Sequence, residues 1–199
     1  MATDITRRAG RPRGFDVTTA LDGAVDVFWE LGYDATTTRD LERRLDISQS
    51  SLYNAFGSKK GLLLASIDRY EERIRGELFS ILTESGGGIE AVERFIAALG
   101  RWIVANEHRG CLVVNLMAAS GDDAAIAERA SAYRATIRDA LFTALRAEPK
   151  TTTRISKVRA EMLLSSVLGL HVTARSTRDA GEVERMIAAI CAQVKTWKY

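Results

Sequence analysis

The sequence contains little proline, the residue that interrupts helices most strongly. Only two of its 199 residues are proline. No run of alternating polar and apolar residues bounded by hairpin turns is present, although antiparallel strands usually show one. Long segments rich in Ala, Leu, Glu and Arg favour helices instead. We therefore predict an all-α protein.

Cysteine and long apolar runs are equally scarce. Cys111 and Cys191 are the two cysteines, and neither CxxC nor Cys/His ligand spacing occurs, so we expect no disulfide, no metal site and no cofactor. No segment approaches the roughly 18 uncharged apolar residues of a membrane span. The basic N-terminus also lacks the apolar core of a signal peptide. These features lead us to expect a cytoplasmic protein without a membrane partner.

Groups that could support catalysis are few. The histidines are His108 and His171, and the sequence shows no Gly-x-Ser-x-Gly elbow and no glycine-rich phosphate loop after a strand. A catalytic site needs convergent acid, base or nucleophilic groups. We therefore expect that the protein is not an enzyme.

Residues 36–59 predict two short helices joined by a tight turn. Thr37 followed by Asp40 predicts a capping box at the start of the first helix. Asp46 tolerates the left-handed conformation that often ends a helix. Ser48 is suited to cap the second helix. This arrangement is typical of a helix-turn-helix.

Polar side chains on and around the second of these helices can contact DNA. Gln and Asn can bond adenine edges with two hydrogen bonds, Ser can bond either base type, and Tyr commonly reaches phosphate. The DNA-binding residues that we predict in this region are Thr37, Arg39, Gln49, Ser50, Ser51, Tyr53, Asn54 and Lys59.

Positive charge is concentrated at the N-terminus, although the net charge is only +2. Arg7, Arg8, Arg11 and Arg13 all fall within the first thirteen residues. A basic arm of this kind can lie in a narrow, electronegative minor groove. We add Arg11 and Arg13 to the predicted DNA contacts, with a solvated terminus as the alternative.

Several spacings between residues 15 and 64 match one family. They are Gly32-Tyr33, Thr36-Thr37, Arg39-Asp40-Leu41, Ile47-Ser48, Leu52-Tyr53, Phe56 and Ser58-Lys59. The stretch resembles the N-terminal signature of the TetR family of transcriptional regulators. This resemblance implies a homodimeric repressor that binds a palindromic operator in double-stranded DNA and is released by a small-molecule effector. The departures from the family pattern, which leave the operator sequence open, are Glu42, Leu45, Asp46 and Asn54.

We divide the chain into a flexible basic arm (1–14), a helix-turn-helix domain (15–60) and a helical effector-binding and dimerisation domain (61–199). A continuous helix is expected from Ser58 through Leu82. The resemblance implies that the last two helices form a four-helix interface with their copies. The apolar seam that we predict for this interface consists of Val167, Leu170, Val183, Ile187, Ile190 and Val194.

An apolar effector pocket is predicted among the central helices. Ordinary core is the alternative for each of the candidate lining residues, which are Trp102, Cys111, Val113, Leu116, Met117, Tyr133, Met162, Val167 and His171. Cys111 has two further interpretations. Its position after His108 and Arg109, at a helix start, favours a reactive thiolate that senses oxidants or electrophiles. The alternative is a small buried hydrophobic residue.

A last alternative concerns the function as a whole. A helical interaction module that never binds DNA would carry the same polar residues on its surface without using them.

Overall fold

The computed structural model describes residues 15–120, 122–177 and 179–198, and this part of the chain contains helices and no strand. The all-α prediction is confirmed. The α-helices are α1 (Val17–Leu31), α2 (Thr38–Leu45), α3 (Gln49–Phe56), α4 (Lys59–Ile74), α5 (Ser80–Thr83), α6 (Gly88–Ala105), α7 (Leu112–Ser120), α8 (Ala124–Arg146), α9 (Thr153–Ser176) and α10 (Ala180–Lys195).

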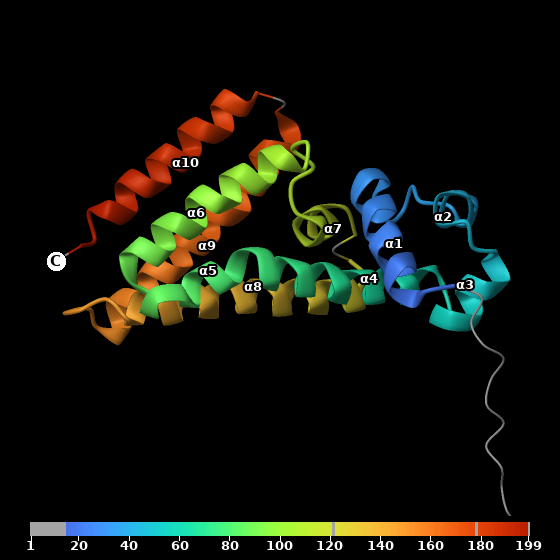
Figure 1. Ribbon diagram of the computed structural model, residues 1–199, viewed down its shortest axis with the longest axis horizontal. Coiled ribbons are helices and arrows are strands. Elements are labelled where there is room, and N and C mark those ends of the chain that lie inside the picture. Colours follow the sequence, from blue (N-terminus) through green and yellow to red (C-terminus); the bar gives the residue numbers. More distant parts are fainter. Residues whose placement is uncertain (1–14, 121, 178, 199) are drawn as a thin grey trace, which may run out of the picture.

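The helices form an elongated molecule with two ends (Figure 1). Helices α1, α2 and α3 gather at one end, and we call them the head. The paired helices α4–α5 and α8 run along the length of the molecule, and α6, α9 and α10 pack at the other end. Helix α7 lies between the head and this bundle. The described helices include none long and apolar enough to cross a membrane.

Local capping explains where the helices of the head begin. The carboxylate of Asp16 accepts a hydrogen bond from the Thr19 amide at 2.7 Å, which lowers the pKa of Asp16. The predicted capping box is present, because Thr37 and Asp40 each cap the backbone amide of the other. Asp46 ends α2 with a left-handed φ of 53°. These boundaries depend on contacts within four residues.

The segment predicted as one helix from Ser58 through Leu82 is helical from Lys59 to Thr83, and it contains a π-helical turn that the sequence did not predict. After α4, the segment Arg75–Phe79 forms a π-helical turn, and α5 follows it. A π-turn inserts an extra residue into a helix and shifts the register of the side chains beyond it. Leu78 and Phe79 thereby reach the core, at 4% and 8% exposure.

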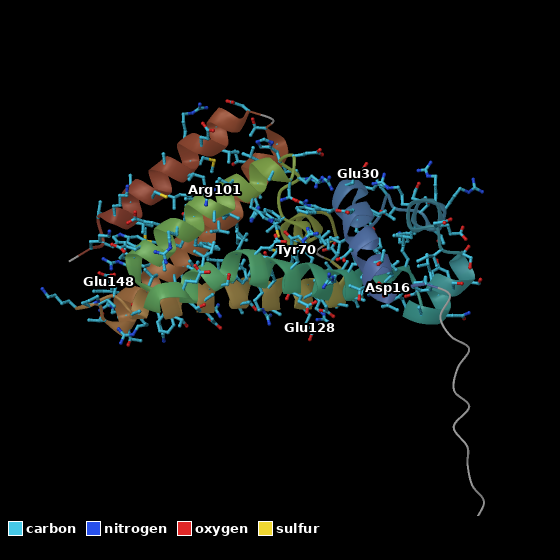
Figure 2. The ribbon with its side chains drawn as sticks, viewed as in Figure 1. Asp16, Glu30, Tyr70, Arg101, Glu128 and Glu148 are labelled. Carbon is cyan, nitrogen blue, oxygen red and sulfur yellow. The ribbon has the colours of Figure 1, made fainter. Side chains whose placement is uncertain are left out.

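One hydrophobic core connects the head to the bundle. It extends without interruption from Phe28 in α1 to Trp197 after α10. Arg69 of α4 binds Asp22 of α1 through both carboxylate oxygens, at 2.7 and 3.0 Å. In Figure 2, Tyr70 lies inside this continuous core, whereas Glu128 and Arg101 lie on the surface. The head is therefore fixed firmly to α4.

Candidate nucleic-acid interface

Contacts between α2 and α3 fix the angle of the second helix. Leu41 and Leu52 are buried, at 0% and 1% exposure. The Oγ1 atom of Thr38 and the Oη atom of Tyr53 lie 2.9 Å apart and share a hydrogen bond. The amide of Gln49 donates to Glu42 Oε1 at 2.5 Å. The first turn of α3 is thus held against α2.

The outer face of α3 exposes the predicted base-reading side chains. Gln49, Ser50 and Asn54 are exposed, and the side chains of Gln49 and Asn54 have no hydrogen-bond partner among the described residues. Ser50 and the half-buried Ser51 contact the Ser48 hydroxyl at 3.1 and 2.9 Å. Because the backbone of α3 is held and its outer amides are free, the helix can present them to a DNA groove.

Other predicted contacts have partners inside the chain. Thr37 Oγ1 bonds Asp40 Oδ2 at 2.6 Å as part of the capping box, and the Tyr53 hydroxyl is shared with Thr38. Arg39 is exposed beside the same turn. Arg11 and Arg13 lie outside the described residues.

The structure corrects the interpretation of Lys59. Its ammonium group donates to the carbonyl oxygens of Tyr33 and Thr36, both at 2.9 Å, and lies 4.4 Å from the centroid of the Tyr33 ring. Lys60 binds Asp123 at 2.7 Å. Lys59 therefore closes the loop between α1 and α2 through hydrogen bonds to two backbone carbonyls.

The head also contacts the turn between α6 and α7. Trp29 Nε1 donates to the carbonyl oxygen of Arg109 at 3.2 Å, and the guanidinium of Arg109 lies 5.6 Å from the Trp29 ring centroid. Arg109 also pairs with Asp26 of α1 at 3.6 Å. The ring of Trp29 stacks on Trp102 of α6, with centroids 5.3 Å apart. The position of α6 is thus coupled to the orientation of α1.

Most residues of the predicted effector pocket are packed in the core. The buried members of that set, each at most 4% exposed, are Cys111, Val113, Leu116, Tyr133, Val167 and His171. Trp102 is half-buried and stacks on Trp29. The sulfur of Met117 accepts a hydrogen bond from Nη1 of Arg134 at 3.6 Å. Met162 is 50% exposed on the outer face of α9. Most of these side chains are thus buried in the interior of the protein.

The environment of Cys111 is the opposite of the one expected for a reactive thiolate. Its thiol is 0% exposed and donates to Tyr133 Oη at 3.6 Å. Burial raises the pKa of Cys111, and hydrogen bonding with Tyr70 and Tyr133 only partly offsets this. The guanidinium of Arg109 pairs with the carboxylates of Asp26 and Glu107, at 3.6 and 3.5 Å. The structure therefore agrees with the second interpretation, in which Cys111 is a small buried hydrophobic residue.

The predicted dimer seam also needs correction. Four of its members are buried within the chain, at 2% exposure or less, and these are Val167, Leu170, Val183 and Val194. Ile187 and Ile190 are half-buried against the same core. Apolar side chains that α9 leaves exposed are Val158, Met162 and Val172, at 55%, 50% and 56%. The free apolar face of α9 is therefore a different one.

The paired, capped helices and the polar outer face of α3 define a helix-turn-helix protein. Comparison with known proteins supports this class. The family model of bacterial regulatory proteins, tetR family, matches residues 20–66. The transcriptional repressor ComR of Escherichia coli (strain K12) is 34% identical over 121 residues, which is 58% of each chain. The uncharacterised regulator YezE of Bacillus subtilis (strain 168) is 35% identical over 83 residues, 42% of this chain and 43% of YezE. The alignments thus span 58% of ComR and 43% of YezE.

Solved structures extend the similarity over the rest of the chain. A cysteine mutant of the TetR-family regulator CifR, complexed with a 26-bp double-strand operator DNA, is 27% identical, with a TM-score of 0.78. That match covers 94% of this chain and 100% of CifR. A TetR regulator from Legionella pneumophila, 20% identical, has a TM-score of 0.79 over 93% of this chain and 98% of its own, and shows the shared fold alone. The family model, the curated relatives and the CifR structure together support a TetR-family transcriptional regulator.

Proposed function

We propose that the protein is a sequence-specific DNA-binding repressor. The observation that carries this proposal is the outer face of α3, where Gln49, Ser50 and Asn54 are exposed on a helix held rigidly by α2. Free amide side chains on such a helix can read base edges in a major groove. The similarity to CifR, which was solved with its operator, supports a double-stranded DNA partner. The similarity to the transcriptional repressor ComR supports repression.

The proposal includes a homodimer formed through the outer face of α9. The exposed residues Val158, Met162 and Val172 recur along this helix at spacings that place them on one side. A two-fold dimer would bury this strip against its copy. Two heads must then lie about 34 to 36 Å apart to enter successive major grooves.

Under this proposal the chain has three functional parts, which are the N-terminal arm (1–14), the helix-turn-helix (15–60) and the effector and dimerisation region (61–199). An effector releases the operator by favouring a conformation in which the heads no longer match that spacing. A ligand shifts this equilibrium only by its difference in affinity for the two conformations. The contacts of Trp29 with Arg109 and Trp102 connect α1 of the head to α6 and to the turn that follows α6, so a movement of α6 can reach the head through them.

A binding experiment with the DNA upstream of the gene, or with a randomised DNA pool, tests this function. Wild-type protein should select a palindromic sequence. Gln49→Ala should relax the preference at one base pair by about 1 to 3 kcal/mol. Thr143→Ala is the control, because it removes an exposed hydroxyl of α8 outside the head. Absence of any sequence preference would favour the alternative of an interaction module.

A further inference from the structure

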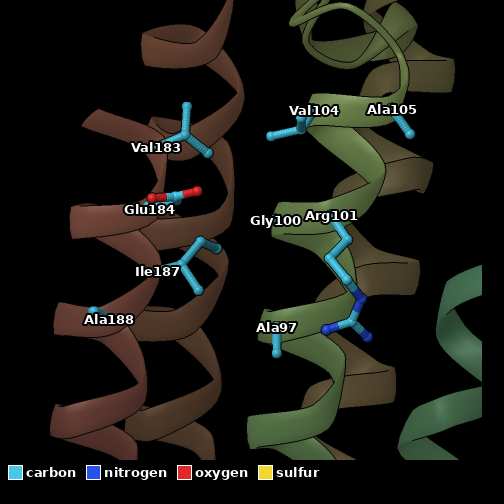
Figure 3. A pocket seen from close by; sticks show the side chains of 9 residues that line it. All are labelled: Ala97, Gly100, Arg101, Val104, Ala105, Val183, Glu184, Ile187 and Ala188. Carbon is cyan, nitrogen blue, oxygen red and sulfur yellow. The ribbon is translucent and has the colours of Figure 1, made fainter. Parts of the chain in front are cut away.

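A solvent-open apolar groove lies between α6 and α10 (Figure 3). Its volume is about 520 Å³. Sites for small organic ligands typically measure about 300 to 1,000 Å³. The residues that line it are Ala97, Gly100, Arg101, Val104, Ala105, Val183, Glu184, Ile187 and Ala188.

Small residues shape this groove. A Cβ atom at Gly100 would lie 2.8 Å from Cγ1 of Ile187, so α6 and α10 meet closely there. Beside this contact, Ala97 and Ala188 are too short to close the space between the helices. Val104 remains 42% exposed. Water in the groove therefore covers apolar surface that a ligand of suitable size would bury favourably.

The groove contains one charged group on each wall. Arg101 lies on α6 and Glu184 on α10 (Figure 3), and neither forms an ion pair with another described residue. A guanidinium binds a carboxylate with two parallel hydrogen bonds. Glu184 repels a carboxylate from the α10 wall, so an anionic ligand would place its charged end at Arg101.

We propose that the groove between α6 and α10 binds a small amphipathic carboxylate, which acts as the effector. Its carboxylate pairs with Arg101, and its apolar body lies against Val104, Val183 and Ile187. The groove contains no residue of α9, the helix that carries the dimer face proposed above. The effector role rests on the proposed function, whereas ligand binding itself does not.

Helix α6 is placed to transmit occupancy of the groove to the head. Trp102, one residue after Arg101, stacks on Trp29 of α1. Ala105 lines the groove and is the last residue of α6, and the turn that carries Arg109 follows it. A ligand that displaces α6 relative to α10 also displaces both of these contacts with α1.

Titration calorimetry without DNA tests the site, with octanoate, 1-octanol and octylamine as probes. Octanoate should bind more tightly than the other two. Arg101→Gln should weaken octanoate about tenfold and change 1-octanol less than about twofold, because only the carboxylate uses the guanidinium. Arg94→Gln is the matched control, since Arg94 is an exposed arginine of α6 outside the groove. It should leave all affinities unchanged.

Two further variants locate the site. Ala188→Trp fills the groove and should abolish binding of octanoate and 1-octanol. Val104→Glu introduces a negative charge and should reduce octanoate binding selectively. Circular dichroism of each variant checks that it folds. Tighter binding of octylamine, equal binding of octanoate and 1-octanol, no binding of octanoate, or unchanged binding to Ala188→Trp would each overturn the proposal.

The same probes added to an operator-binding assay separate the two proposals. Octanoate should weaken DNA binding by wild type, and an about tenfold higher concentration should be needed for the same effect on Arg101→Gln. Octanoate binding by a protein that selects no DNA sequence would refute the proposed function and retain the site. DNA binding that octanoate leaves unchanged, despite measured octanoate binding, would refute the effector role.

Discussion

Trp29 Nε1 donates a hydrogen bond to the carbonyl oxygen of Arg109 at 3.2 Å, although the two residues are 80 positions apart. This bond joins α1, which supports the DNA-reading helices, to the turn that follows α6. Glu107 and His108 in the same turn have positive φ angles of 56° and 59°. Residues other than glycine rarely adopt this conformation. The turn is thus held in an unfavourable backbone geometry that presents the Arg109 carbonyl to Trp29.

The first prediction concerns this bond. Trp29→Phe removes the indole donor, and the remaining ring still packs on Trp102. We expect a loss of about 1 kcal/mol in the free energy of unfolding, the usual net value of one hydrogen bond. The effector should also change the operator affinity of this variant less than that of wild type, because the head is then less tightly linked to α6. Unchanged effector response in a DNA-binding titration would contradict the coupling.

The second prediction concerns Lys59. Lys59→Met leaves the carbonyls of Tyr33 and Thr36 without their shared donor and should lower the free energy of unfolding by about 1 to 3 kcal/mol. Lys60→Met breaks a partly exposed pair with Asp123 and should cost no more than about 1 kcal/mol. Urea denaturation compares the two variants. A Lys59→Met protein of wild-type stability with weakened DNA binding would restore the phosphate-contact interpretation.

The third prediction concerns Cys111. Because burial excludes solvent and raises its pKa, the thiol should react with iodoacetamide only when the protein opens or unfolds. Mass spectrometry should find alkylation of half-buried Cys191 before that of Cys111. Cys111→Ser identifies the site and should keep operator binding. Rapid alkylation of Cys111 at neutral pH, with release of DNA, would establish the sensor instead.

The fourth prediction concerns His171, which is 4% exposed and packs edge-on against Trp102. Burial lowers the pKa of His171 to about 4, from 6.5. The folded state therefore favours the neutral ring, and protonation favours the unfolded state as the pH falls. Stability should be full above pH 6.5 and decrease from there to about pH 4, by up to about 3 kcal/mol. Urea denaturation across this range should show a shallower decrease for His171→Phe than for wild type.

The fifth prediction concerns the dimer. Met162→Glu places a charge on the exposed apolar face of α9 and should convert the dimer to a monomer of 21.9 kDa, as measured by light scattering. Operator affinity should fall with it. Val104→Glu is a matched control, because Val104 is a comparably exposed apolar residue, at 42%, on α6. It should remain dimeric while losing octanoate binding.

The sequence by itself determined the features that depend on neighbours along the chain. The capping box of Thr37 and Asp40, the left-handed Asp46 and the Ser48 cap are formed by residues at most four positions apart. Such contacts can be inferred from residue order alone. The same local rules place Gln49 and Asn54 on the outer face of α3.

Only the tertiary structure decided how distant groups are used. The partners of Lys59 lie 26 and 23 residues away, and no local pattern identifies them. Helix α9 has apolar residues on more than one face, and periodicity cannot tell which face meets the core. Packing buries Val167 and leaves Val158 and Met162 exposed. The same packing surrounds Cys111 and raises its pKa, because the desolvation of the thiol depends on every helix around it.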